Sequence, residues 1–324
     1  MANNRLFGHL AASFAAVNWG FTFILSNMLL KAGLSAYEAL LLRSLVAYAF
    51  LWLISLAARQ NGDGPFLSRR LRQNGDGPFL SRWLKGQRLY MVAGMTGLSV
   101  YYLLDYTALL YTSASFVTLI CATVPLFVTI ALWLVHRERP SRFFLIGSLV
   151  AVFGVAVVAT AGGEALRVTA TGTLLVAAGN VLWAIYTLVG RQIDAAGATD
   201  SPTLQQSVNN MRKVFFWAIA SLLAAMPLFG FDVSWKVLFQ VQVFIPILVL
   251  GVMTSALTFI AYGLSVRLLG AARAGVYLYF PPVIGALAGH FLLGETLTVW
   301  GVAGIAVVVV GLLLSELKRG EASG

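Results

Sequence analysis

Ten stretches of about 20 residues, nearly free of charge, limit what this chain can fold into more than any other feature. They are 8–30, 37–58, 88–110, 114–135, 142–161, 170–191, 212–230, 243–266, 272–293 and 296–315. A helix needs about 20 apolar residues to cross a hydrocarbon layer of about 30 Å. The stretches are too long, and alternate too little, to be strands of a membrane barrel. The sequence therefore predicts an all-α integral membrane protein with ten transmembrane helices.

Composition supports this prediction. Of the 324 residues, 59% are hydrophobic and only 10% are charged, whereas a soluble domain carries about 25% charged residues. The mean hydropathy is +0.85. Because the first apolar stretch is long and lacks an A-x-A-type cleavage site, we read it as a retained helix and not as a cleaved signal.

The basic residues indicate the orientation of the chain. The net charge is +10, and 18 of the 22 Lys and Arg residues fall in segments on one side when the ten helices alternate in direction. Basic residues gather in cytoplasmic loops, so we expect both termini in the cytoplasm. We expect membrane lipids as partners and no nucleic acid, because no basic cluster marks a soluble face.

Residues 59–82 contain the same eleven residues twice, RQNGDGPFLSR, thirteen positions apart. Two short copies are too few for a solenoid, and one aspartate in each copy is too little for a calcium loop. The segment lies in the predicted cytoplasmic loop between the second and third helices, where insertions cost little. We interpret it as a tandem duplication without a function of its own, whether natural or artificial in origin.

A longer and weaker repeat divides the chain into halves, residues 1–166 and 167–324. A shift of 157 positions superimposes one proline, one glutamate and two glycines of each half: Pro125 on Pro282, Glu138 on Glu295, Gly147 on Gly304 and Gly154 on Gly311. A shift of 164 superimposes Trp19 on Trp183. Because each half has five helices, an odd number, the halves are expected to be inverted in the membrane, as in many secondary transporters. Glycines seven apart lie on one helix face and predict close helix packing.

Several motifs resemble those of the EamA-type transporters of the drug/metabolite transporter superfamily. In the first half they are Trp19-Gly20, Arg43, Tyr111-Thr-Ser-Ala-Ser115, Pro125-Leu-Phe and Glu138-Arg139. In the second half they are Leu269-Gly-Ala-Ala272, Pro282, Gly294-Glu295-Thr296 and the spacing of Gly304 and Gly311. The resemblance covers nearly the whole chain. It implies ten helices around a central cavity and the export or exchange of small metabolites.

The chain departs from the family pattern in two places. His136-Arg137-Glu138 stands where the family usually has Leu-Gly-Glu, and residues 59–82 carry the doubled loop.

Sequence motifs of enzymes are absent, namely HExxH, GxSxG, GxxxxGK and CxxC. His9, His136 and His290 fall in different segments and at different predicted depths. With a single cysteine, the chain has no multi-cysteine metal site. We therefore expect no enzymatic activity, no cofactor and no metal site.

Two ionisable residues fall inside predicted helices, where a charge costs about 3 kcal/mol on insertion scales. Arg43 and Asp105 are both expected about 8–9 Å below the outer surface, from a rise of about 1.5 Å per residue. One interpretation is a static ion pair that stabilises the outer half. The other is a functional Asp105 that binds a substrate amine or a coupling proton.

Aromatic and amide side chains at mid-depth are the remaining candidates for a substrate site. They are Asn18, Trp19, Tyr101, Tyr102, Asn180, Trp183, Tyr262 and Tyr279, together with Asp105. Buried aromatic residues commonly serve helix packing, and the alternative is a cavity wall that holds cations on its π faces. We expect Trp19 and Trp183 on opposite walls of one cavity. Pro125 and Pro282 are expected to break or kink their helices.

The leading hypothesis is a secondary active or facilitative transporter of the cell inner membrane. It would export small metabolites such as amino acids by alternating access, with protons as a candidate coupling ion. A lipid-linked substrate flippase and a membrane scaffold without a substrate are the alternatives. The buried Arg43 and Asp105 argue against the scaffold, which has no need of them.

Overall fold

The computed structural model describes residues 2–59, 79–112, 114–137, 139–161, 168–196, 204–293 and 298–316. These residues contain helices and no strand, as predicted. The duplicated segment, apart from Arg59 and residues 79–82, lies outside the described residues, and so do Glu138 and Glu295. The helical elements are α1 (Ala2–Lys31), α2 (Ala36–Arg59), α4 (Phe79–Gly94), η1 (Met95–Ser99), α5 (Val100–Tyr111), α6 (Ala114–Cys121), α7 (Val124–His136), α8 (Arg142–Ala161), α9 (Ala170–Ala196), α10 (Leu204–Phe229), α11 (Trp235–Leu238), α12 (Val241–Val249), η2 (Leu250–Leu257), α13 (Thr258–Leu269), α14 (Ala271–Val276), η3 (Tyr277–Tyr279), α15 (Phe280–Leu293) and α16 (Val299–Glu316).

Seven helical segments of the described chain are long and apolar enough to cross a membrane. They are Asn4–Lys31, Ala36–Ala57, Leu119–His136, Arg142–Ala161, Ala170–Ala195, Leu204–Phe229 and Val241–Leu269. The three other expected spans fall on α4 to α5, on α14 to α15, and on α16, whose apolar part is Val299–Ser315. The membrane-protein class is thus supported, while the count of ten spans stays a prediction.

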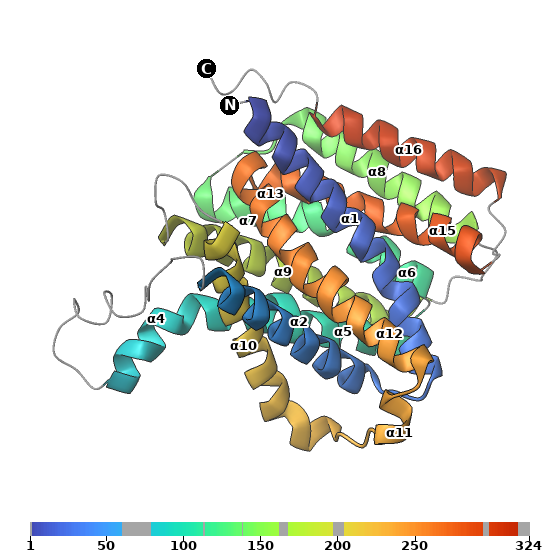
Figure 1. The fold of residues 1–324 in the computed structure, drawn as a ribbon. Coiled ribbons are helices and arrows are strands. Elements are labelled where there is room, and N and C mark those ends of the chain that lie inside the picture. Colours follow the sequence, from blue (N-terminus) through green and yellow to red (C-terminus); the bar gives the residue numbers. More distant parts are fainter. Residues whose placement is uncertain are drawn as a thin grey trace.

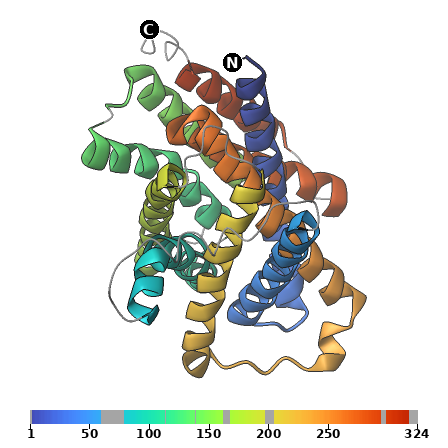
Figure 2. The ribbon, with the colours of Figure 1, turned by 60° about the vertical axis from the view of Figure 1, so that its left-hand side comes forward.

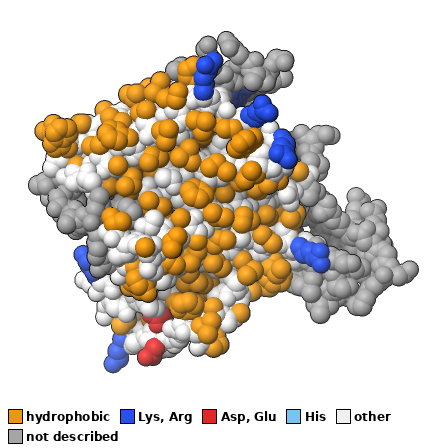
Figure 3. Space-filling model, turned by 180° about the vertical axis from the view of Figure 1, so that it is seen from behind, with side chains coloured by type: hydrophobic (Ala, Val, Ile, Leu, Met, Phe, Trp, Pro, Cys, Tyr) orange, Lys and Arg blue, Asp and Glu red, His pale blue; other side chains and the backbone are white. Residues whose placement is uncertain are grey.

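The helices form one bundle in which α1 begins and α16 ends at the same end (Figures 1 and 2). We call this the terminal end, and it is the end that the sequence predicts to be cytoplasmic. Hydrophobic side chains cover the face seen in Figure 3, and Lys and Arg appear toward its margins. Such an apolar belt suits contact with lipid.

Helices α8 and α16 pack side by side through glycine, as the spacing of the glycines predicted (Figure 1). A Cβ atom built on Gly154 would lie 2.6 Å from the backbone nitrogen of Val308 and 2.9 Å from the carbonyl oxygen of Gly304. In the same way, a Cβ atom built on Gly147 would lie 2.5 Å from the carbonyl oxygen of Gly311. Any larger residue would force the two backbones apart, so these four glycines set the helix separation.

Irregular turns interrupt the helices at the places where proline or close packing requires them. The span over 114–135 breaks between Cys121 and Val124, with Pro125 in the first turn of α7. The 3-10 turn η3 comes directly before the paired prolines of α15. Two π-helical segments, η1 and η2, lie in the third helix of each predicted half, and π-helical turns are frequent at functional sites.

Arg137, which ends α7, adopts the left-handed conformation with φ of 59°. This is the position at which the resembling family usually has glycine. Glycine takes this conformation without the steric cost that a side chain carries. The departure from the family motif therefore puts a strained residue at this turn.

Candidate functional site

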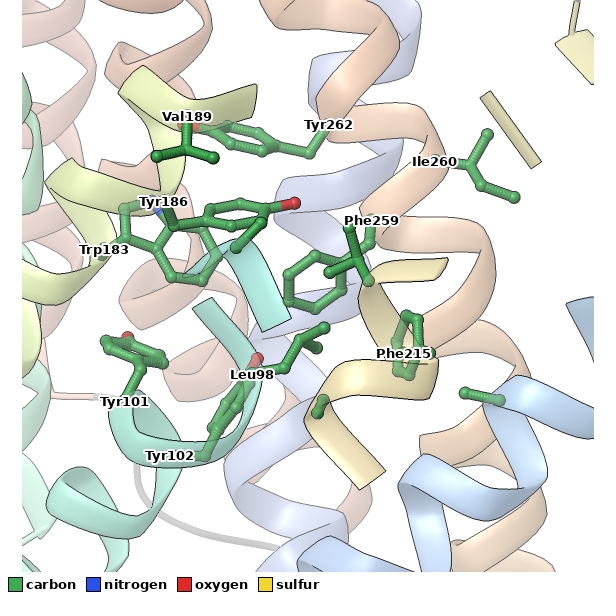
Figure 4. Close-up of a cluster of buried hydrophobic side chains, with 14 of the residues drawn as sticks. Leu98, Tyr101, Tyr102, Trp183, Tyr186, Val189, Phe215, Phe259, Ile260 and Tyr262 are labelled. Carbon is green, nitrogen blue, oxygen red and sulfur yellow. The ribbon is translucent and has the colours of Figure 1, made fainter. Parts of the chain in front are cut away.

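A layer of five aromatic side chains crosses the centre of the bundle, and we call it the aromatic layer. It consists of Trp19 from α1, Trp183 and Tyr186 from α9, and Phe259 and Tyr262 from α13. Neighbouring rings have centroids 5.2–5.8 Å apart, within the range of favourable aromatic pairs. Figure 4 shows Trp183 between Tyr262 on one side and Tyr101 on the other.

Trp19 and Trp183 meet inside this layer instead of facing each other across an open space. Their ring centroids are 5.3 Å apart in an edge-to-face arrangement, and the residues are 7% and 3% exposed. Both indoles line one cavity, as the repeat predicted, but they touch each other and so do not stand on opposite walls of it. The two indole rings contact each other and thus fill the middle of the bundle.

A cavity of about 80 Å³ lies against one side of the layer, and we call it the outer cavity. Its lining comes from α1, α5, α9, the break between α6 and α7, and the start of α15. Five of the predicted site residues line it: Trp19, Tyr101, Tyr102, Asp105 and Trp183. Pro282, which the sequence predicted as a kink, lines it too, together with the neighbouring Pro281.

Asp105 is the acidic group of the outer cavity, and it is 3% exposed. Its Oδ2 accepts a weak hydrogen bond from the thiol of Cys121 over 3.7 Å. Among the described residues, its Oδ1 has no hydrogen-bond partner. The side chain of Asp105 lies against α9 at Gly179, which has no side chain, and a Cβ atom built on this glycine would be 3.1 Å from Oδ1.

Arg43 is fully buried beside the same wall, but it does not form the expected ion pair with Asp105. Its Nε donates to Ser255 Oγ at 3.1 Å, and its Nη1 donates to the hydroxyl of Tyr106 at 3.2 Å. The guanidinium carbon lies 4.3 Å from the ring centroid of Tyr102. The two tyrosines, one helical turn apart, occupy the face of α5 that Arg43 reaches, so Asp105 is turned away toward α9.

Through these contacts Arg43 links three parts of the bundle. Ser255 belongs to the π-helical segment η2, and Tyr106 also shares a 2.7 Å hydrogen bond with Ser26 of α1. Arg43 thus holds Tyr102 and Tyr106, both of which line the outer cavity. Its buried Nη2 has no hydrogen-bond partner in the part of the chain that the structure describes.

Four predicted site residues lie outside this lining. Asn18 donates to the carbonyl of Phe14 in its own helix at 2.8 Å. Asn180 donates to the carbonyl of Ile120 at 2.8 Å and to Thr123 Oγ1 at 3.0 Å, and so satisfies the backbone that the break before Pro125 leaves open. Tyr279 is buried in a separate cluster that includes residues of α8 and α16. Tyr262 borders the other side of the aromatic layer.

Sequence reasoning missed Thr22, Tyr106 and Cys121 as cavity residues. A signal existed for Tyr106, because it follows Asp105 and lies four residues after Tyr102 on the same helix face. Thr22 lies three residues after Trp19, so the same rule would have found it. Cys121 had no signal, because its exposure to the cavity depends on the helix break.

The outer cavity combines a free carboxylate oxygen with aromatic faces. Such a site can hold an ammonium group by a charge-assisted hydrogen bond and by cation–π contact. Within the described ranges, no group of three or more His, Cys, Asp or Glu residues could hold a metal ion.

A buried polar and aromatic cavity within a bundle of apolar helices is the arrangement found in membrane transporters. The chain belongs to the EamA-like transporter family, whose pattern it matches over residues 6–160 and 170–317. It is therefore a multi-pass membrane protein.

Named relatives are transporters and exporters. The chain is 26% identical to a probable terminal-alkyne amino-acid exporter of Streptantibioticus cattleyicolor, over 74% of this chain and 78% of that protein. It is 26% identical to the threonine/homoserine exporter RhtA of Escherichia coli K12, over 60% and 64% of the two chains. An uncharacterised transporter of Archaeoglobus fulgidus is 26% identical over 70% and 76%. A protein crystal structure shares the fold, with a TM-score of 0.70, 18% identity and 96% and 98% of the chains covered.

Proposed function

We propose that this protein exports α-amino acids across the cell inner membrane and that the outer cavity binds the substrate. The observation that carries the proposal is Asp105, a buried carboxylate that, among the described residues, has one oxygen without a hydrogen-bond partner and no cation beside it. A buried charge of this kind is costly in a membrane and is retained where it has a task. Two relatives whose names include amino-acid export support this choice of substrate.

The ammonium group of the substrate would bind Asp105, and the side chain would lie against Tyr101, Tyr102 and the two indoles. These rings offer π faces to the ammonium and apolar surface to the side chain. The small volume, about 80 Å³, favours small amino acids over bulky ones in this conformation.

Alternating access would move the aromatic layer, which stands between the outer cavity and the terminal end of the bundle. The two predicted halves both contribute to this layer, Trp19 from the first and Trp183 from the second. Rocking one half against the other would separate the rings and open the opposite path. Protons are the proposed coupling ion, with Asp105 as the group that exchanges substrate for proton.

Counterflow in proteoliposomes tests the proposal. Vesicles with purified protein are loaded with each of the common amino acids in turn, and exchange of the labelled amino acid is measured. We expect exchange with small amino acids, threonine among them, and no exchange of the matching 2-hydroxy acids, which lack the ammonium. Absence of exchange for every amino acid would refute the proposal, and movement of lipid probes instead would support a flippase.

Asp105→Asn should abolish this exchange, because the amide cannot neutralise an ammonium group. Asp232→Asn is the matched control, since Asp232 lies in the segment between α10 and α11, away from the cavity. Equal activity of the two variants would contradict the role of Asp105.

A further inference from the structure

A second cavity, of about 40 Å³, lies on the other side of the aromatic layer, and we call it the inner cavity. Its walls come from α4, α9, α10 and α13. Tyr186 and Tyr262 close it toward the middle of the bundle. The residues farther along, Asp194 near the end of α9 and Ser207 near the start of α10, place it toward the terminal end.

One charged side chain, that of Asp194, lines the inner cavity, and the oppositely charged guanidinium of Arg267, next in sequence to the lining residue Val266, lies near it. Asp194 lines it and is half-buried, and the guanidinium of Arg267 is near enough for a Coulombic interaction with this carboxylate. Within the described part of the chain, no hydrogen bond joins the two side chains. Instead Arg267 Nη1 donates to Ser207 Oγ at 3.4 Å, a long contact, and the buried Arg267 Nε has no hydrogen-bond partner in the described ranges.

The cavity also has free space beside both charges. A Cβ atom added to Gly190, one turn before Asp194, would meet no atom within 4 Å. A Cβ atom added to Gly263, one turn before Arg267, would meet only Met211 Cε at 3.9 Å. The missing side chains at these two positions leave room in the wall of the inner cavity, one turn before each charged residue.

We propose that the inner cavity is a second binding site, which receives the α-amino and α-carboxylate groups of an amino acid before it passes the aromatic layer. Asp194 would bind the ammonium, and Arg267 would bind the carboxylate through its free Nε and its weakly held Nη1. A zwitterion satisfies both groups at once, whereas a simple amine or a simple acid leaves one charge unmatched. The inference rests on the proposed export of amino acids.

The volume of the inner cavity agrees with a site for the charged groups alone. It is half that of the outer cavity, 40 against 80 Å³. The variable side chain would therefore stay on the side of the terminal end while the charged groups are held. Such a site would select for the zwitterionic backbone and leave selection of the side chain to the aromatic walls of the outer cavity.

Transport kinetics from each side of the membrane test the second site. Inside-out vesicles present the cytoplasmic face to the labelled amino acid, and right-side-out vesicles present the other face. The probes are L-threonine, or the amino acid of the panel that exchanges fastest, and its methyl ester, which keeps the ammonium but loses the carboxylate. The variants are Asp194→Asn and Arg267→Gln, with Arg5→Gln as an exposed control near the start of α1.

Asp194→Asn should raise the KM in inside-out vesicles about tenfold or more, because a hydrogen bond to a charged group is lost, and should leave the KM in right-side-out vesicles unchanged. Arg267→Gln should raise the KM of the amino acid in the same way but leave inhibition by the methyl ester unchanged. Arg5→Gln should behave as wild type.

The inner site is refuted if wild-type protein transports the amino acid while both variants keep a KM within about twofold of wild type in inside-out vesicles. It is also refuted if the KM changes equally at the two faces. If the wild-type protein transports no amino acid, the proposed function itself fails, and that result is distinguishable from the first two.

Discussion

Replacing Trp183 by alanine should destabilise the bundle strongly, because this indole is the centre of the aromatic layer. Trp183 is 3% exposed, and five rings pack on it with centroids 4.9–5.8 Å away. These rings belong to Trp19, Tyr101, Tyr186, Phe259 and Tyr262. Because rigid rings from three further elements cannot all collapse into the gap, we expect a loss near the top of the range for such truncations, about 4–5 kcal/mol.

Trp19→Ala should cost less, about 3 kcal/mol. Trp19 is 7% exposed and packs on three rings of the layer, those of Trp183, Phe259 and Tyr262. Trp183→Phe is the matched control, because it keeps a ring in the layer and removes the indole nitrogen, which has no hydrogen-bond partner among the described residues. We expect this variant to lose less than half of what the alanine variant loses.

Denaturant unfolding of the purified variants, followed by circular dichroism in one detergent, measures these differences. The free energy of unfolding should fall in the order wild type, Trp183→Phe, Trp19→Ala, Trp183→Ala. If the free energy of unfolding of Trp183→Ala lies within about 1 kcal/mol of the wild-type value, the variant behaves like a substitution at the surface. In that case the indole is not a packing centre and the layer is not a closed barrier.

Three further predictions concern the scaffold. Gly154→Leu should prevent normal assembly of α8 with α16, since a Cβ atom alone would lie 2.6 Å from the backbone nitrogen of Val308. The control variant Gly86→Ala should fold normally, because no atom lies within 4 Å of a Cβ at that position. The yield of monodisperse protein in detergent compares the two variants, and equal yields would contradict the packing of α8 on α16. Arg137→Gly should raise the free energy of unfolding by about 1 kcal/mol, because φ of 59° suits glycine; a less stable variant would show that Arg137 makes a compensating contact. Deletion of residues 59–71 should leave expression and counterflow near wild type, and a large loss of either would show that the duplicated segment has a task.

The sequence was sufficient to predict the class of the fold because membrane helices can be identified from their length and apolar composition. It also predicted close helix packing at the glycines of α8 and α16, though not that these two helices pack on each other, and a break or kink at Pro125, since both depend on local residue types. The arrangement of side chains at the centre depended on tertiary contacts that no spacing reveals. Asn180 illustrates this, because only the structure shows that its amide serves the broken backbone near Ile120.

Arg43 and Asp105 show the same limit for the candidate site. Their equal predicted depth suggested an ion pair, but depth does not specify the direction in which a helix face points. Tyr102 and Tyr106 take the face of α5 nearest to Arg43, and Asp105 faces Gly179 instead. The free carboxylate that this leaves is the basis of the proposed amino-acid site.

The most direct test of that site compares the binding of an amino acid with that of its 2-hydroxy acid, in wild-type protein and in Asp105→Asn. Titration calorimetry in detergent with L-threonine, or with the amino acid that exchanges fastest, gives the four dissociation constants. The account predicts that wild-type protein prefers the amino acid by at least about tenfold, which is about 1.4 kcal/mol, and that Asp105→Asn binds both compounds with similar, weak affinity. A variant that keeps the wild-type preference would contradict the assignment of the outer cavity as the site that recognises the substrate amine.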